Sequence, residues 1–117
     1  MTFTPQDKEL AIERLLAVES DLEFAVLIGS RASATQTTGS DWDIALQWRN
    51  DMDWLEQLGR TETLRRALAE ALAIPETVID LIDAPRASLA MRAVIAEEGV
   101  ALKGDDDLPW QRFLRRT

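Results

Sequence analysis

An apolar run from Phe24 to Ile28 stops abruptly at Gly29-Ser30. Five consecutive apolar residues followed by a turn signal are typical of a buried β-strand, and glycine next to serine permits the tight turn that ends it. A second strand is predicted from Asp43 to Trp48, where large apolar residues occupy every second position. The first strand therefore delivers Ser30 to an edge of a sheet, and the second begins at an aspartate.

Helix and strand patterns alternate along the rest of the chain. A helix is predicted from Thr4-Pro5 to about Glu19, and the small polar stretch 31–40 is expected to be a loop or one short helix. Further helices are predicted at 51–58 and 61–72 with Gly59 as a break between them, from Pro85 to Gly99, and around Trp110, Phe113 and Leu114; further strands are predicted at 77–83 and 100–102.

This order of elements predicts an α/β (α+β) fold, with a mixed sheet of about four strands flanked by helices. A chain of 117 residues is the size of one domain, and shorter pieces would bury too little surface to be stable alone. No repeat or linker divides the sequence. We therefore expect residues 1–117 to form a single domain.

The composition excludes several kinds of chemistry. Cysteine and histidine are both absent, so the chain can form neither a disulfide framework nor a thiolate or imidazole metal site. No stretch approaches the roughly 18–20 apolar residues of a membrane span, and the N-terminus lacks the pattern of a leader, so a cytoplasmic location is expected. The formal charge of −8 argues against nucleic acid and favours a basic protein partner, although acidity can also serve solubility alone.

Two aspartates stand at the start of the second predicted strand. Asp41 and Asp43 are two residues apart, so both side chains are expected to leave the same face of the strand. Such carboxylates repel each other unless a cation lies between them, and Mg²⁺ commonly joins one or two carboxylates to substrate phosphates. Gly29-Ser30 can offer those phosphates backbone amides and a hydroxyl group. The sequence therefore predicts a site for a metal and a nucleotide.

A third carboxylate is predicted at Asp80, in the middle of the apolar strand 77–83. An unpaired charge in such a strand is costly to bury, so Asp80 needs a partner. Asp83 has the opposite strand parity and lies at the end of the strand, which makes Asp80 the better candidate for the site. Because the chain has no histidine or cysteine, Asp80 could accept the proton of an attacking hydroxyl group.

These segments together resemble a known superfamily. Gly29-Ser30-Arg31-Ala32, followed by Ser40-Asp41-Trp42-Asp43-Ile44-Ala45-Leu46, is similar to the glycine-serine and Asp-x-Asp signature of the DNA polymerase β-like nucleotidyltransferases. The short length and Val78-Ile79-Asp80-Leu81-Ile82-Asp83 resemble the minimal nucleotidyltransferase branch, the MntA-type antitoxins paired with HEPN-domain toxins. The likeness spans roughly residues 10–104. Many members have glycine where this chain has Ala34, after a basic residue where it has Ser33, which implies looser phosphate contact.

The resemblance implies a role for each matching residue. Gly29, Ser30 and Arg31 would contact the nucleotide, with Ser30 at its β- or γ-phosphate. Asp41 and Asp43 would bind two Mg²⁺ ions, while Asp80 would complete one metal shell and activate the acceptor. The implied reaction is transfer of AMP from ATP to a tyrosine of the partner HEPN toxin, which silences its ribonuclease activity. The chain would act as an antitoxin in a hetero-oligomer with that toxin.

Two other functions remain open at this point. The chain could be a binding antitoxin that masks its toxin by contact alone, with a vestigial or regulatory nucleotide site. It could also be a transferase for a small hydroxylated molecule such as an aminoglycoside. Three converging acids would bring nothing to a pure binding module, which favours an enzyme. A chain of 117 residues leaves little room for a domain that recognises a small acceptor.

Simpler structural roles also remain open for the individual residues. Gly29-Ser30 alone would be an ordinary turn, Asp41 could only cap the second strand, and Arg31 could be a surface charge. Asp80 could instead be held in an ion pair by one of three arginines: Arg65, Arg66 or Arg86. The tryptophans Trp42, Trp48 and Trp54 are interpreted as core or interface residues, and the run Asp105-Asp106-Asp107 as a solvated loop.

Overall fold

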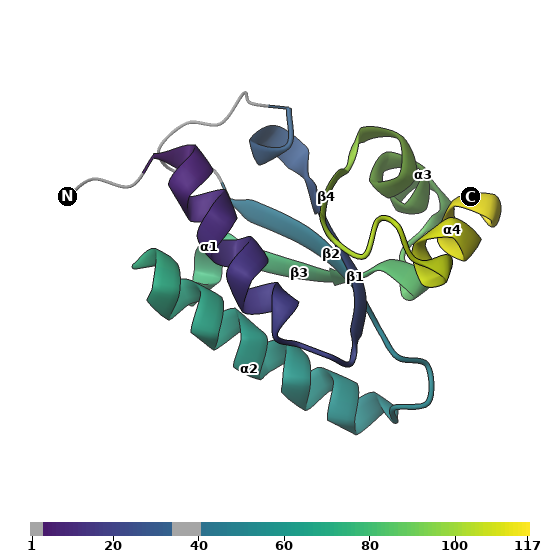
Figure 1. Ribbon diagram of the computed structural model, residues 1–117, viewed down its shortest axis with the longest axis horizontal. Coiled ribbons are helices and arrows are strands. Elements are labelled where there is room, and N and C mark those ends of the chain that lie inside the picture. The colour runs from purple at the N-terminus through teal and green to yellow at the C-terminus, as the bar shows by residue number, and fades with distance from the viewer. Residues whose placement is uncertain (1–3, 34–40) are drawn as a thin grey trace.

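The computed structural model describes residues 4–33 and 41–117, which form a sheet with helices on both faces (Figure 1). The α-helices are α1 (Pro5–Ala17), α2 (Trp54–Leu72), α3 (Leu89–Glu98) and α4 (Leu108–Arg115). The strands are β1 (Leu22–Ile28), β2 (Trp42–Trp48), β3 (Ile79–Asp83) and β4 (Val100–Lys103). Three short 3₁₀-helices within the described ranges are η1 (Gly29–Arg31), η2 (Glu76–Val78) and η3 (Ala84–Arg86).

The four strands lie in the order β3-β2-β1-β4. β1 pairs antiparallel with both β2 and β4, whereas β2 and β3 are parallel. Parallel neighbours need a crossover connection, and α2 provides it between β2 and β3. The predicted α+β class, with a mixed sheet of four strands flanked by helices, is confirmed.

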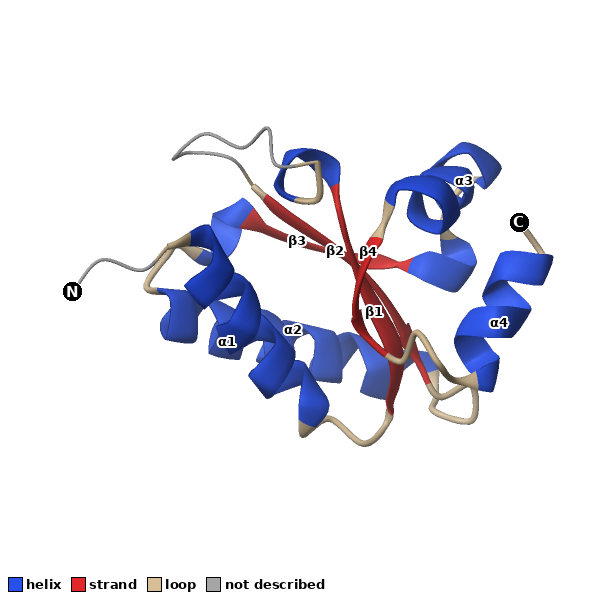
Figure 2. Ribbon diagram, turned by 45° about the horizontal axis from the view of Figure 1, so that its top comes forward, coloured by secondary structure: helices blue, strands red, loops and turns tan. Residues whose placement is uncertain are grey.

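The sheet has a separate hydrophobic core on each face. Figure 2 shows α1 and α2 on one side of the strands and α3 and α4 on the other. The α1/α2 core takes in alternate β2 residues such as Trp42 and Ile44, and the α3/α4 core takes in Ala45 from the same strand. In the second core the ring of Phe24 lies 5.0 Å from that of Trp110, which fixes α4 to β1. The run Phe24–Ile28 is buried throughout, as its composition predicts.

One predicted break in the chain is wrong, because α2 continues through Gly59 as a single helix of 19 residues. Gly59 is exposed, and a Cβ at its position would meet nothing within 4 Å. Glycine in an exposed helix costs only about 1 kcal/mol relative to alanine. Burial of the helix side that contains Leu64, Leu68 and Leu72 outweighs this cost.

Two other boundaries differ from the sequence prediction. The helix expected from Pro85 begins later, because Ala84–Arg86 form η3 and α3 begins at Leu89. Ser88 is the N-cap of α3, and its hydroxyl oxygen accepts a hydrogen bond of 3.1 Å from the Met91 amide. The third strand begins at Ile79 because the residues before it form η2. The capping interaction of Ser88 therefore decides where α3 starts.

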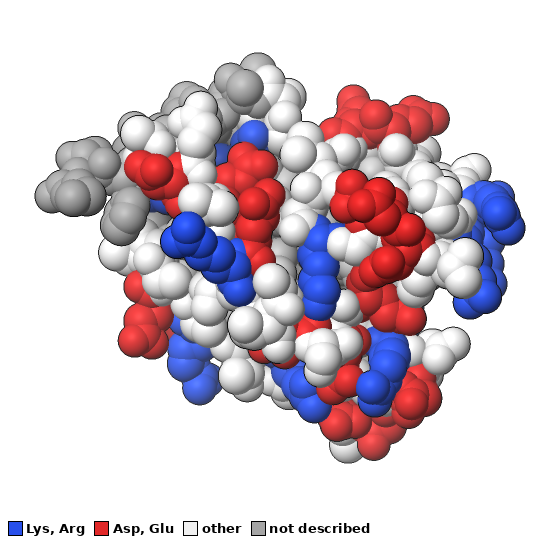
Figure 3. All heavy atoms as spheres, in the orientation of Figure 1, with Lys and Arg blue, Asp and Glu red and all other residues white. Residues whose placement is uncertain are grey.

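The net negative charge is unevenly distributed over the surface. On the face seen in Figure 3, acidic side chains gather over α3 and the turn before α4, and basic side chains lie near the end of α4. The basic residues in the last turn of α4 are Arg112 and Arg115. The Asp105-Asp106-Asp107 run is exposed, as expected for a solvated loop.

None of the helices that the structure describes is both long enough and apolar enough to cross a membrane.

Candidate functional site

Gly29 brings the end of β1 directly against Asp43. Ile28, the last residue of β1, pairs with Asp43 in β2, and the chain then turns into η1. Gly29 has a φ of 77°, and a Cβ at this position would lie 2.6 Å from the Oδ2 atom of Asp43. A larger residue would therefore have to displace the carboxylate and would also adopt an unfavourable left-handed conformation. Only glycine lets the backbone stand this close to the acid.

The parallel pairing of β2 with β3 sets Asp43 beside Asp80. Leu81 packs against the α1/α2 core, whereas Ile82 packs against the α3/α4 core. Since side chains alternate along a strand, Asp80 projects from the same face as Ile82, which is the α3/α4 face. Asp43 projects from this face too, because Ala45, two residues further along β2, belongs to the α3/α4 core. Two carboxylates thus leave neighbouring strands on the same face of the sheet.

Asp80 is exposed, whereas Asp43 is partly buried. The expectation that Asp80 is buried in its strand, and needs a partner for that reason, is therefore wrong, because its side chain lies on the edge strand in contact with solvent. In the part of the chain that the structure describes, none of the three candidate arginines pairs with Asp80. Arg65 pairs with Glu62, and Arg86 pairs with Asp83 at 3.5 Å.

Negative charge is concentrated around Asp43. Burial raises the pKa of the Asp43 carboxyl group above its ordinary value of 3.8, and the charges of Asp80 and Asp41 raise this pKa further. A bound cation would have the opposite effect, because it favours the ionised form of a carboxyl group. Asp41 and Asp80 are thus both close enough to influence Asp43, and this repulsion favours a cation beside Asp43.

A closed turn holds Ser30 next to the contact between Gly29 and Asp43. The Ala32 amide donates a hydrogen bond of 3.1 Å to the carbonyl oxygen of Gly29. The Ser33 hydroxyl donates one of 3.3 Å to the carbonyl oxygen of Ser30. The turn therefore fixes the backbone of Ser30, which follows directly after Gly29, the residue that lies against Asp43.

Arg31 stacks on a core tryptophan. Its guanidinium carbon lies 4.3 Å from the ring centroid of Trp42, and burial lowers the pKa of Arg31. Trp42 belongs to the α1/α2 core, on the face of the sheet opposite to Asp43. The stacking thus gives Arg31 a structural role of its own, and the predicted contact of Arg31 with a nucleotide stays a prediction.

The predicted metal ligands do not form a ready-made cluster. Within residues 4–33 and 41–117, no group of three or more acidic side chains is arranged to hold a metal ion. Asp41, exposed immediately before β2, lies next to a part of the chain that is not described, which also contains Ala34. Asp43 and Asp80 still supply two adjacent carboxylates, a donor set that fits Mg²⁺ when substrate phosphates provide further oxygens. The role of these acids as metal ligands stays a prediction.

Two features of the site were not foreseen from the sequence. One is the direct approach of Gly29 to Asp43, which follows from the antiparallel register of β1 and β2. The other is the direct pairing of Asp43 with Asp80: the sequence predicts that both acids belong to the site, but not that β2 and β3 are parallel neighbours. The sequence signal for both was the glycine at the end of one strand and the aspartates within two others, but pairing and register come only from the fold.

Comparison with known proteins gives a family and several similar structures. A family model described as polymerase beta, nucleotidyltransferase matches residues 11–108. No curated protein matches the chain. A solved toxin-antitoxin structure with AMP-PNP has a TM-score of 0.69 and 29% sequence identity, covering 92% of this chain and 82% of that chain.

Two further solved structures have the same fold. A mutant of the toxin-antitoxin MntA-HpeT has a TM-score of 0.68 and 27% identity, covering 92% of this chain and 82% of that one. A tri-AMPylated Shewanella oneidensis HEPN toxin in complex with MNT antitoxin has a TM-score of 0.66 and 24% identity, covering 97% and 82%. Since the family model matches most of its length, the chain belongs to the polymerase β nucleotidyltransferase family.

Proposed function

We propose that this chain is an antitoxin that transfers AMP from ATP to a tyrosine hydroxyl group of a HEPN-type toxin. The observation that carries the proposal is the Asp43–Asp80 pair on one face of the sheet, with Gly29 against Asp43. The similar structures support the partner and the nucleotide, because one is a toxin-antitoxin with AMP-PNP and another contains a tri-AMPylated HEPN toxin. Modification would silence the toxin within a hetero-oligomeric complex.

Each residue of the site has a distinct part in this reaction. Gly29 keeps the space beside Asp43 free of a side chain, so that phosphate oxygens can approach the backbone there. The Ser30 hydroxyl donates to a phosphate oxygen and holds the triphosphate. Asp80 is exposed on the edge strand, where an acceptor protein can reach it, and it accepts the proton of the tyrosine hydroxyl.

The bond changes balance without any further reactant. The tyrosine oxygen forms a bond to the α-phosphorus of ATP, the bond from that phosphorus to the bridging oxygen breaks, and pyrophosphate leaves. The phenolic proton passes to the Asp80 carboxylate. Asp41, Asp43 and Asp80 would hold Mg²⁺, which when bound neutralises charge on the triphosphate and on the leaving group.

A binding antitoxin is the second candidate, and one observation favours it. Among the described residues, the acids form no ready-made metal site with three ligands. The same arrangement is expected of a vestigial nucleotide site. In that case the chain would mask its toxin by contact, and the acids would be dispensable. The two candidates therefore differ in whether the toxin changes mass.

The test is mass spectrometry of the cognate HEPN-type toxin after incubation with the chain, ATP and Mg²⁺. We expect the toxin to gain one or more AMP units on tyrosine. Replacing both Asp41 and Asp43 with asparagine should abolish this gain, because no carboxylate would remain at the start of β2. Asp105→Asn with Asp106→Asn is the matched control, since it removes the same charge from an exposed loop elsewhere.

If the wild-type chain neutralises the toxin without any change of mass, and the asparagine pair neutralises it equally well, the transferase proposal fails and the binding antitoxin replaces it. Gain of AMP in the control but not in the site variant would tie the reaction to the two acids.

A further inference from the structure

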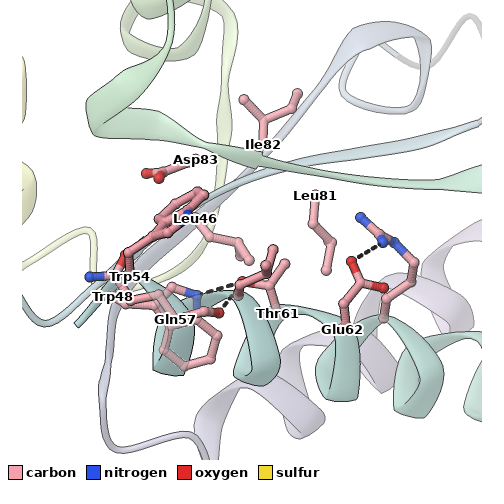
Figure 4. Close-up of a pocket in the computed structure, with 11 residues that line it drawn as sticks. Leu46, Trp48, Trp54, Gln57, Thr61, Glu62, Leu81, Ile82 and Asp83 are labelled. Carbon is pink, nitrogen blue, oxygen red and sulfur yellow. Dashed lines mark hydrogen bonds and ion pairs between the residues drawn. The ribbon is translucent and has the colours of Figure 1, made fainter. Parts of the chain in front are cut away.

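A pocket of about 140 Å³ opens between the first half of α2 and strand β3 (Figure 4). Its lining is mainly apolar and includes Leu46, Trp48, Trp54, Leu58 and Leu81. Figure 4 shows Leu81 pointing from β3 toward α2, while Ile82 points to the opposite side. The pocket therefore lies on the α1/α2 face of the sheet, whereas Asp43 and Asp80 project from the other face.

Three polar side chains of the lining are already hydrogen-bonded. The Trp48 indole nitrogen donates a hydrogen bond of 3.0 Å to the Thr61 hydroxyl oxygen, and that hydroxyl donates one of 2.8 Å to the Gln57 carbonyl oxygen. The Gln57 amide nitrogen donates in turn to the Met52 carbonyl oxygen at 2.8 Å. A polar ligand would gain little from these groups, so the pocket suits an apolar occupant. A cavity of about 150 Å³ lined by apolar residues can hold a group the size of benzene.

The apolar surface continues outside the pocket. Trp54 is 49% exposed, Leu55 77% and Leu58 45%, all within the first turns of α2. The guanidinium of Arg86 lies 4.0 Å above the Trp54 ring and also pairs with Asp83, which holds the indole at the pocket mouth. Adjacent exposed apolar side chains beside a pocket are typical of a surface that contacts another protein.

Acidic residues outnumber basic ones around this surface. The acids are Asp53, Glu56, Glu62, Asp80 and Asp83. Three arginines lie among these acids, since Arg65 pairs with Glu62, Arg86 pairs with Asp83, and Arg60 lies 3.9 Å from Glu56. Five acids against three arginines leave an excess of negative charge. A second copy of the chain would bring two such acidic rims together and would be repelled. Charge complementarity instead favours a partner with basic residues.

We propose that this surface, made of the pocket and the exposed edge of β3, is the docking site for the acceptor protein. A basic segment of that protein inserts one large apolar side chain between Trp54, Leu58 and Leu81. The inference rests on the proposed function, because it takes the acceptor to be a protein.

The docking surface is placed to bring the acceptor to the acids. Leu81 lines the pocket, and Asp80, the residue before it, projects from the opposite face of the same strand. β3 is the last strand of the sheet, so a partner seated in the pocket lies against the strand edge and can extend around it. Docking on one face thus delivers a hydroxyl group to the carboxylates on the other.

The test compares two leucines of equal exposure. Leu58 in the pocket and Leu10 on α1 are each 45% exposed, so Leu58→Ser and Leu10→Ser remove similar apolar groups from helix surfaces. The probe is the cognate HEPN-type toxin, and the measurement is its dissociation constant by calorimetry. We expect Leu58→Ser to weaken binding by about tenfold or more, the scale of losing an interface anchor, and Leu10→Ser to leave it unchanged.

Equal binding by Leu58→Ser and the wild-type chain would overturn the docking site. If Leu58→Ser does not fold, judged by its melting temperature, Trp54→Ala replaces it, because half of the Trp54 side chain is in solvent. A concentration-dependent dimer that is lost in Leu58→Ser but kept in Leu10→Ser would show that the occupant is a second copy, which also overturns the proposal.

The outcome is independent of whether AMP is transferred. Binding that depends on Leu58 together with an unmodified toxin would support the docking site and defeat the transferase proposal. Binding that ignores Leu58 together with an AMP-modified toxin would do the reverse. For a working transferase, Leu58→Ser should raise the KM for the toxin about tenfold and leave kcat unchanged, since the acids lie on the other face.

Discussion

The two faces of the sheet differ in how far their helices cover it. Among the described residues, sixteen buried hydrophobic residues form the core under α1 and α2, whereas eight form the core under α3 and α4. The first core follows β2 from Trp42 to Trp48, while the second takes in Ala45 and leaves Asp43 at its margin. The comparison shows that the carboxylates stand where the thinner core ends, so that one face supplies stability and the other can supply chemistry.

The largest effect should come from the better-covered face. Leu68 has no exposed surface and lies in the α1/α2 core, so Leu68→Ala should lower the free energy of unfolding by about 2–5 kcal/mol. Urea unfolding would measure this loss. AMP transfer per folded molecule should stay unchanged. A loss below about 1 kcal/mol would mean that this core contributes less than its burial indicates.

Asp80→Asn should produce the opposite result on the thinner face. We expect a loss of about 100-fold in kcat for AMP transfer, the usual scale for removing a positioned base, with no loss of stability. Rapid-quench measurement at saturating toxin would give kcat, and Asp83→Asn is the control because Asp83 lies beside α2 and pairs with Arg86. Full activity in Asp80→Asn, or its complete loss in Asp83→Asn, would show that the wrong acid was chosen.

Gly29→Ala should affect both properties. The left-handed conformation of residue 29 costs about 1–2 kcal/mol for alanine, and the added Cβ would push against the Asp43 carboxylate. We therefore expect lower stability together with weaker binding of ATP. Thermal unfolding with and without nucleotide measures both effects. Gly59→Ala is the matched control, because Gly59 has open space around it and should gain about 1 kcal/mol from helix propensity. Destabilisation of both variants alike would count against a special role for Gly29.

The smallest effect concerns pH. The pKa of Asp43 is raised in the folded chain, so the folded state binds more protons than the unfolded state, and the contribution of Asp43 to stability falls as pH rises above 3.8. Without divalent cations, Asp43→Asn should therefore be more stable than the wild-type chain at pH about 7, and the difference should vanish below pH about 4. Urea unfolding at both pH values measures this. A wild-type chain that is the more stable of the two at neutral pH would contradict the repulsion among the acids.

The sequence predicts the strands better than the details of the helices. The apolar run at Phe24–Ile28 is typical of a strand buried on both faces. The alternation in β2 fits only a strand, because the side-chain period of a strand is two. The predicted break at Gly59 was wrong, because the low helix propensity of one glycine costs less than the burial of a whole helix face contributes. The predicted start of the third long helix at Pro85 was wrong, because the side chain of Ser88 caps α3 and the helix begins after it.

The site was predictable only as a set of residue types. Glycine at a strand end and aspartates at alternate positions indicate the chemistry, but the Asp43–Asp80 alignment depends on which strands become neighbours. The exposure of Asp80 depends on β3 being an edge strand, which no local pattern reveals. The stacking of Arg31 on Trp42 joins two segments that the sequence alone could not pair.

The position of β1 has a consequence for how the chain folds. β1 pairs on one side with β2, which follows it closely in sequence, and on the other side with β4, which comes late in the chain. Pairing distant segments is slow because a long loop must close before any contact compensates for the lost entropy. We therefore expect β1–β2 pairing to precede β4 docking, with an apolar strand edge exposed in the interval. Aggregation during refolding would begin at this edge.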